Sequence, residues 1–168
     1  FTIGKVPFGY LGFGDFSVLM FFGWLSVMGG WYLQAHMLSL AIFLPATACG
    51  LLATAVLNIN NLRDIDSDRE NGKITLVVRL GPVNARRYHA CLLAGAIICL
   101  ALFNLLSLQS VWGWLFLLAT PLPFKQARFV MRELSPKAMP PMLERTVKGA
   151  LLTNLLFGVG IILSPVHF

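Results

Sequence analysis

The sequence predicts an all-α, multi-pass transmembrane helical bundle, and three observations lead to that fold class. Of its 168 residues, 57% are hydrophobic and only 12% are charged, which is too apolar for an ordinary soluble domain. The mean hydropathy of +0.76 is correspondingly high. Several stretches also reach the length of about 20 apolar residues that an α-helix needs to cross a bilayer.

Five spanning helices are expected after a glycine-rich connection that covers residues 1–14. The turns near 35–37 and 107–110 are short, so the helices that flank each turn are expected to be antiparallel. Three prolines are expected to kink their helices, namely Pro45, Pro121 and Pro123. The predicted spans are 16–34, 38–58, 88–107, 111–130 and 147–164.

The basic residues predict the orientation of the bundle. All thirteen lie at Lys5, in 63–87 or in 125–148, and five crossings put these three places on one face. The two short turns and the last five residues carry no Lys, Arg, Asp or Glu. By the positive-inside rule, the charged face is cytoplasmic. The net charge of +6 therefore reflects orientation, and no nucleic-acid binding is predicted.

The cysteines and histidines indicate neither a disulfide framework nor a zinc site. Cys49, Cys91 and Cys99 lie in apolar stretches, are odd in number and form no CxxC pair. The three histidines are far apart and lack metal-ligand spacing.

The polar stretch 58–81, between two apolar runs, is where chemistry is expected. It holds four of the seven acidic residues together with four basic ones. If the preceding helix continues through it, Asn60, Asp64 and Asp68 lie at i, i+4 and i+8 on one face. Two carboxylates one turn apart repel each other, and a divalent cation would reverse that repulsion. Mg²⁺ takes one or two protein carboxylates, some waters and substrate phosphate oxygens.

The second half of this stretch carries candidate phosphate-binding groups. Asn71-Gly72 is a predicted helix stop. Beyond it, Lys73, Thr75 and Arg79 can reach back to a phosphate as charge-assisted donors. The alternative is a solvated polar loop that holds the helix ends at the membrane surface. The spacing of the two aspartates alone leaves both interpretations open.

Residues 60–81, NNLRDIDSDRENGKITLVVRLG, resemble the second aspartate-rich motif of the UbiA superfamily of intramembrane aromatic prenyltransferases. Within it they resemble the 1,4-dihydroxy-2-naphthoate polyprenyltransferases of menaquinone synthesis, in which NxRDxxxD is followed by GKxTLxxRLG. The residues that match are Asn61, Arg63, Asp64, Asp68, Gly72, Lys73, Thr75, Leu76, Arg79, Leu80 and Gly81.

The resemblance implies a nine-helix fold with two aspartate motifs, one after helix two and one after helix six. This chain matches helices five to nine, so residues 1–168 are expected to be the C-terminal part of such a domain. The first motif is absent from the sequence, and the remaining acids are isolated from one another, at Asp15, Glu133 and Glu144. We therefore expect these residues alone to be inactive and to need the N-terminal helices of the same protein. The expected location is the bacterial inner membrane, with the charged loops in the cytoplasm.

The resemblance also implies an activity. It is the transfer of a polyprenyl group from its diphosphate to 1,4-dihydroxy-2-naphthoate, with release of diphosphate and CO₂, giving demethylmenaquinone. Mg²⁺ would be held by Asp64 and Asp68. Five further residues and Tyr10 complete the predicted site: Lys73, Arg79 and Arg63 would bind the diphosphate, Asn60 and Asn61 would ligate the cation or orient its waters, and Tyr10 would lie near the aromatic acceptor.

Other classes stay open at this point. A related prenyltransferase could use 4-hydroxybenzoate, haem or a chlorophyll precursor, although the GKxTLxxRLG run argues against it. A phosphatidyl-alcohol transferase would need DxxDGxxAR, which the sequence lacks. A transport or structural subunit would line a path with intramembrane polar residues. The helix interiors hold few of these, and they are better interpreted as interhelical hydrogen-bonding groups.

Overall fold

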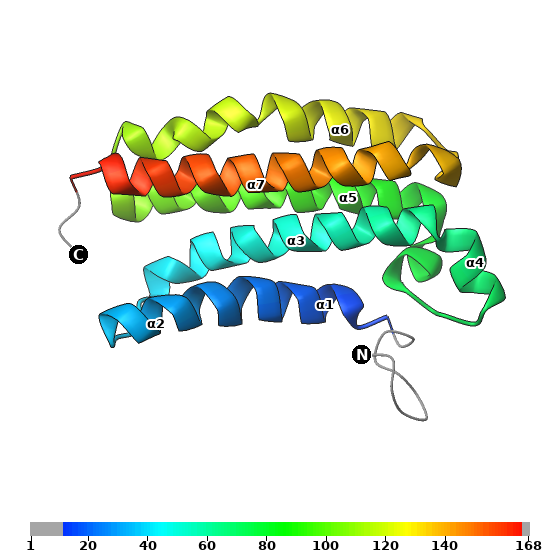
Figure 1. Ribbon diagram of the computed structural model, residues 1–168, viewed down its shortest axis with the longest axis horizontal. Helices are drawn as coiled ribbons and strands as arrows, with labels where there is room; N and C mark the ends of the chain where they lie inside the picture. The colour runs from blue at the N-terminus through cyan, green and yellow to red at the C-terminus, as the bar shows by residue number, and fades with distance from the viewer. Residues whose placement is uncertain (1–11, 166–168) are drawn as a thin grey trace.

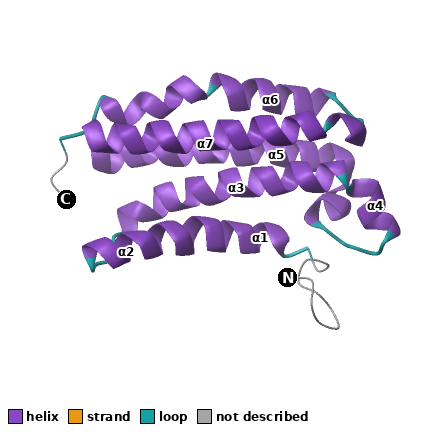
Figure 2. Ribbon diagram, viewed as in Figure 1, coloured by secondary structure: helices purple, strands orange, loops and turns teal. Residues whose placement is uncertain are grey.

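The computed structural model describes residues 12–165, and this part of the chain is helical with no strand (Figure 2). The predicted all-α class is therefore confirmed. The elements follow one another in the order α1 (Gly14–Val18), η2 (Leu19–Met28), α2 (Gly29–Ala35), η3 (Leu40–Ile42), α3 (Phe43–Arg63), α4 (Ile65–Glu70), α5 (Leu76–Phe103), η4 (Asn104–Leu108), η5 (Trp112–Ala119), α6 (Pro121–Arg132), η6 (Pro136–Ala138) and α7 (Pro140–Leu163).

Four continuous helical segments in the described part of the chain are long and apolar enough to cross a membrane. They are Gly14–Ala35, Leu40–Arg63, Leu76–Leu108 and Pro140–Leu163. These four correspond to the first, second, third and fifth predicted spans, and the chain is a multi-pass membrane protein by this measure.

The fourth predicted span, 111–130, is not one helix: the kink expected at Pro121 and Pro123 is confirmed, but it goes as far as dividing the span into two helical pieces. It is divided into η5 and α6 at Thr120, because Pro121 and Pro123 lack the backbone N–H groups that a continuous helix would use there. The two pieces still lie end to end along α7 and form a fifth pass along the bundle (Figure 1). The kink expected at Pro45 was wrong: Pro45 lies in the first turn of α3, where a proline is tolerated, and α3 continues through it.

The third span begins well before the predicted residue 88. The Thr75 hydroxyl accepts a hydrogen bond from Val78 N at 3.3 Å and caps the start of α5 at Leu76. The backbone leaves the helical region at Gly81, next to Pro82, and then continues as helix to Phe103. The GKxTLxxRLG segment is therefore a helix start and a bend.

Two glycines let η2 approach α3 very closely. A Cβ atom at Gly23 would lie 2.6 Å from the Ala46 carbonyl oxygen and 2.8 Å from Gly50 Cα, so no larger residue fits without a shift. Helix pairs in membranes pack through such small residues because they let the backbones touch. This contact also holds α1, which continues into η2, against the middle of α3.

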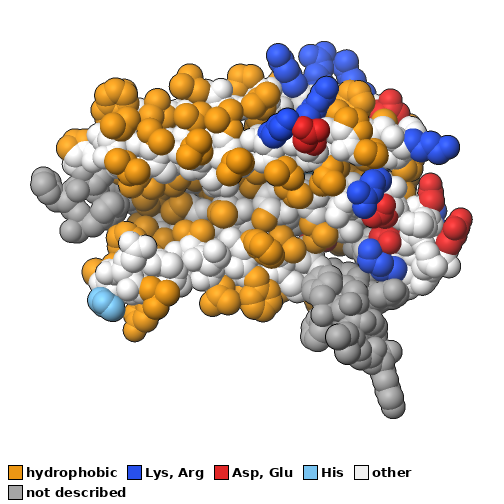
Figure 3. Space-filling view, viewed as in Figure 1, with side chains coloured by type: hydrophobic (Ala, Val, Ile, Leu, Met, Phe, Trp, Pro, Cys, Tyr) orange, Lys and Arg blue, Asp and Glu red, His pale blue; other side chains and the backbone are white. Residues whose placement is uncertain are grey.

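The charged side chains gather at the end of the bundle that carries α4 and the connection between α6 and α7, which we call the polar end (Figures 1 and 3). The basic residues within 12–165 lie in 63–87 and 125–148, as the sequence predicts; Lys5 lies outside the described residues. Large hydrophobic side chains are exposed along the rest of the bundle, including Leu40, Val111 and Ile162, and suit a lipid environment.

The buried side chain of Arg86, in α5, connects two helices at the polar end. Its guanidinium donates to the carbonyl oxygens of Glu133 and Leu134, each at 2.8 Å, and to that of Pro82 at 2.7 Å. The side chain is 2% exposed. It therefore satisfies two backbone acceptors where α6 ends and one within α5, and so connects the end of α6 to α5.

We expect cysteine substitutions at Gln109 and Lys137 to be labelled from opposite sides of the membrane. The reason is that Gln109 lies in the turn between η4 and η5, whereas Lys137 lies at the polar end. The measurement is accessibility to a membrane-impermeant thiol reagent in a background in which Cys49, Cys91 and Cys99 are replaced. Labelling of both positions from the same side would refute the fifth pass formed by η5 and α6.

Candidate functional site

The predicted helix does not continue unbroken through Asp64, although its backbone hydrogen bonds do continue across this residue. Helix α3 ends at Arg63, and Asp64 adopts φ −97° and ψ 8° before α4 begins. Two helical hydrogen bonds nevertheless span the bend, from Asp64 N to Asn60 O at 3.1 Å and from Asp68 N to Asp64 O at 2.8 Å. The spacing of these three residues by one turn each is therefore kept.

Each of the two aspartates is paired with a cation. Arg63 Nε and Nη2 donate to the two carboxylate oxygens of Asp64, both at 2.7 Å, in a bidentate pair. Lys73 Nζ lies 3.0 Å from both oxygens of Asp68. The Asp68 side chain is 9% exposed and that of Asp64 36%, so the Lys73 pair is the better shielded from water.

The hydrogen bonds from Arg63 hold the pKa of Asp64 below its ordinary value. Because the shift is downward, the stabilisation from this pair is present at neutral pH and is lost only as the pH falls through the lowered pKa. Asp64 is thus a carboxylate, ready to bind a cation, throughout the physiological range.

A local backbone motif brings Lys73 to Asp68. The N–H of Gly72 bonds to Arg69 O at 3.2 Å and that of Lys73 bonds to Asp68 O at 2.8 Å, which is the Schellman pattern. Gly72 takes the positive φ of 68° that this motif needs, as the predicted stop at Asn71-Gly72 requires. The chain therefore folds back over the end of α4 and places the Lys73 ammonium on the carboxylate.

Three asparagines line the end of α3. Asn61 is 7% exposed, and the side-chain oxygen of Asn60 is buried without a hydrogen-bond partner. Asn58, to which no role was assigned from the sequence, is fully buried with neither side-chain polar atom partnered. Buried amides without partners are costly, and they are typical of places where a ligand or water completes the hydrogen bonding.

Of the two remaining predicted site residues, Arg79 lies within the described part of the chain and Tyr10 does not. Arg79 is exposed in the first turns of α5, and its guanidinium lies beside Gly12, where a Cβ atom would come within 3.1 Å of Nε. Arg79 therefore lies between the start of α1 and the start of α5. Tyr10 lies outside the described residues.

Asp15, which carried no predicted role, joins the predicted residues. It is 6% exposed in the first turn of α1, and its side chain lies near the hydroxyl group of Tyr88. Asn61 and Lys73 line the same cavity of about 60 Å³, whose walls are Gly12, Gly14, Asp15, Leu57, Asn61, Lys73, Thr75 and Leu76. Asp15 directly precedes the predicted span 16–34, and the structure includes it in the first spanning segment, Gly14–Ala35. An ionisable residue at the start of an apolar helix was the available signal.

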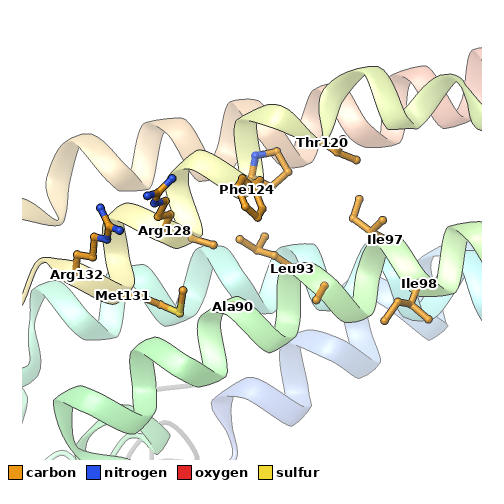
Figure 4. Close-up of a pocket in the computed structure, with 12 residues that line it drawn as sticks. Ala90, Leu93, Ile97, Ile98, Thr120, Phe124, Arg128, Met131 and Arg132 are labelled. Atoms are coloured by element: carbon orange, nitrogen blue, oxygen red, sulfur yellow. The ribbon is translucent and has the colours of Figure 1, made fainter.

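The larger cavities lie elsewhere. A groove of about 700 Å³ runs between α5 and α6, with an apolar floor that includes Leu93 and Ile97 and with Arg128 and Arg132 at one end (Figure 4). A second cavity, of about 600 Å³, lies beside Trp31 and Phe157. None of the predicted site residues lines either one, so size alone does not identify the site.

The donor set fits a hard divalent cation. Within residues 12–165 no cluster of three or more His, Cys, Asp or Glu could enclose a metal by itself. Asp64 and Asp68 with the unpartnered oxygen of Asn60 nevertheless provide the few oxygen ligands that Mg²⁺ takes when substrate phosphates and waters supply the rest.

An apolar helical bundle whose charged side chains and buried amides gather at one end is typical of an intramembrane protein. The model of the UbiA prenyltransferase family matches residues 2–157, and the chain belongs to that family.

Curated relatives agree with this assignment. The chain is 78% identical over 164 residues to the 1,4-dihydroxy-2-naphthoate octaprenyltransferase of Escherichia coli K12, and 47% identical over 164 residues to that of Haemophilus influenzae. These alignments cover 98% of this chain and 53% of each relative. Human UbiA prenyltransferase domain-containing protein 1 is 32% identical over 96% of the chain and 46% of its own length. The chain thus spans about half the length of these relatives.

Proposed function

We propose that the protein containing this chain transfers a polyprenyl group from its diphosphate to 1,4-dihydroxy-2-naphthoate, releasing diphosphate and CO₂ and forming the quinol form of demethylmenaquinone. The observation that carries the proposal is the pairing of Asp64 with Arg63 and of Asp68 with Lys73 at the polar end. The names of the E. coli and H. influenzae relatives support the same acceptor.

The paired residues suggest how a diphosphate is bound. In the structure each cation neutralises a carboxylate, at 2.7 Å for Arg63 and 3.0 Å for Lys73. When a diphosphate with its metal arrives, the carboxylates can take the metal and the two cations can turn to diphosphate oxygens. Net charge in the site stays near balance during this exchange, which keeps the cost of bringing a polyanion to the membrane boundary low.

Mg²⁺ held by Asp64 and Asp68, with Asn60 beside them, would neutralise the charge that develops on the leaving diphosphate. Lys73 and Arg79 would bind the same diphosphate from the start of α5 as charge-assisted donors. The apolar residues below, including Leu57 and Leu76, would keep water from the allylic cation until the electron-rich ring attacks it.

We further propose that the protein lies in the bacterial inner membrane with the polar end in the cytoplasm, because the basic residues gather there. Residues 1–168 would be the C-terminal part of the domain, and the other helices of the same protein would complete the cavity. Its substrates would be the polyprenyl diphosphate and the naphthoate, and the bilayer would surround both.

The acceptor decides between this activity and that of a sister prenyltransferase. We expect the full-length protein to prenylate 1,4-dihydroxy-2-naphthoate and to release one CO₂ for each prenyl group transferred. The measurement is the ratio of labelled CO₂ to prenylated product. Faster turnover of 4-hydroxybenzoate, with no CO₂ released, would assign the protein to the other branch of the family.

A further inference from the structure

Asp15 is a buried carboxylate with an unused oxygen. Its side chain lies near the hydroxyl group of Tyr88, and the Thr54 hydroxyl donates to its backbone carbonyl oxygen at 3.4 Å. Its Oδ2 atom is buried and has no hydrogen-bond partner. A buried carboxylate oxygen without a donor is costly, so the fold maintains this group at the expense of stability.

The cavity beside Asp15 indicates what would complete its hydrogen bonding. Its volume of about 60 Å³ admits a hydroxyl group or a few waters and is too small for a fused aromatic ring. Among the residues that line the cavity, Asp15 alone is acidic, so the lining lacks the further carboxylates that would favour a metal ion there. A hydrogen-bond donor that carries no positive charge therefore suits Oδ2, and a hydroxyl group is such a donor.

The cavity also lies at the right place for the second substrate. Lys73 and Thr75 form its side toward the proposed diphosphate site, whereas Leu57 and Leu76 form an apolar side. An aromatic acceptor whose hydroxyl enters this cavity would have its ring between the diphosphate and the hydrocarbon of the bundle. This is the region where the allylic carbon must lie when the C–O bond to the diphosphate breaks.

We propose that Asp15 is the catalytic base that takes the hydroxyl proton of the aromatic acceptor, an inference that rests on the proposed function. The ring carbon next to the hydroxyl, which carries the carboxylate, forms the C–C bond to the prenyl group. The C–O bond to the diphosphate breaks and its electron pair leaves with the diphosphate. The hydroxyl oxygen becomes a carbonyl, and its proton passes to Asp15 Oδ2.

The proton is returned in the second half of the reaction. When CO₂ leaves the carbon that has just been alkylated, the electron pair of the broken C–C bond flows back into the ring, which becomes aromatic again. The carbonyl oxygen then recovers the proton from Asp15. No oxidant, reductant or further acid is needed, and Asp15 is again a carboxylate at the end of the cycle.

The test is Asp15→Asn in the full-length protein, with Asp66→Asn as the matched control. Both changes are isosteric, and Asp66 is an exposed residue of α4 to which no role is assigned. We expect Asp15→Asn to lower the rate of prenyl transfer to 1,4-dihydroxy-2-naphthoate by about 10²-fold or more, the usual contribution of a general base. Asp66→Asn should change it by less than about twofold. Thermal unfolding of the purified proteins checks that both variants fold.

Measurements with a second acceptor distinguish a role of Asp15 as a catalytic base from a purely structural role. An acceptor with an electron-withdrawing ring substituent ionises its hydroxyl without help, so the ratio of wild-type to Asp15→Asn rates should fall to within about tenfold. An equal ratio for both acceptors, a wild-type rate in Asp15→Asn, or a loss that follows unfolding would each overturn the role of Asp15. The wild-type rate with 1,4-dihydroxy-2-naphthoate tests the proposed function separately, because it does not depend on the variant.

Discussion

Replacing Asp64 or Asp68 by asparagine in the full-length protein should lower prenyl transfer by about 10³-fold or more, which corresponds to about 4 kcal/mol of lost transition-state stabilisation. Each change keeps the shape of the side chain and removes the negative charge that would hold Mg²⁺. It also leaves Arg63 or Lys73 without its carboxylate partner. The measurement is the Mg²⁺-dependent rate of product formation, with membrane insertion checked by thiol labelling.

The rates of the variants should be compared at limiting Mg²⁺ concentration, because weakened metal binding lowers the rate most under that condition. Asp66→Asn is again the control, because Asp66 lies between the two residues in sequence and is exposed. If either variant turned over at the wild-type rate under these conditions, the assignment of the metal ligands would be wrong.

Residues 1–168 alone should show no detectable prenyl transfer. A diphosphate ester brings several negative charges, and Asp64 and Asp68 with their neighbouring bases form only one wall around it. The chain spans about half the length of its curated relatives, so we expect the helices that close the cavity against lipid and water to come from the other half. An allylic cation would therefore lose its shelter.

The comparison needs purified residues 1–168 and a chimera in which this chain follows the remaining half of the E. coli relative. At 78% identity, the contacts between the two halves should be largely preserved in the chimera. We expect Mg²⁺-dependent turnover from the chimera alone. Comparable rates from both proteins would show that two copies of this chain can form the second wall by dimerising.

The two ion pairs were predicted from the sequence only in part. The sequence placed Asp64, Asp68, Arg63 and Lys73 in one short stretch, and it assigned the acids to a metal and the bases to a diphosphate. The structure pairs the acids with the bases directly. The choice follows from electrostatics at the polar end, where each carboxylate is neutralised by the nearest cation in reach.

Local features of the chain were determined by the sequence itself. The spacing of Asn60, Asp64 and Asp68 follows from backbone hydrogen bonds over four residues, and the turn at Gly72 follows from the need for a positive φ. Hydrophobic length was enough for the all-α class, because a helix is the way a single apolar segment satisfies its backbone inside a bilayer. The break at Thr120 also has a local cause, since Pro121 and Pro123 lack N–H groups, but its outcome as two packed pieces was not foreseen.

Only the tertiary structure decided that Asp15 lines the same cavity as Asn61 and Lys73. It is 46 residues away from Asn61 along the chain, and no spacing rule connects the two. They meet because Gly23 and Gly50 let η2 approach α3 until their backbones touch, which holds α1 beside Thr54 and Tyr88. Such an approach depends on the absence of two side chains in separate helices, and its effect appears only when the helices are packed together.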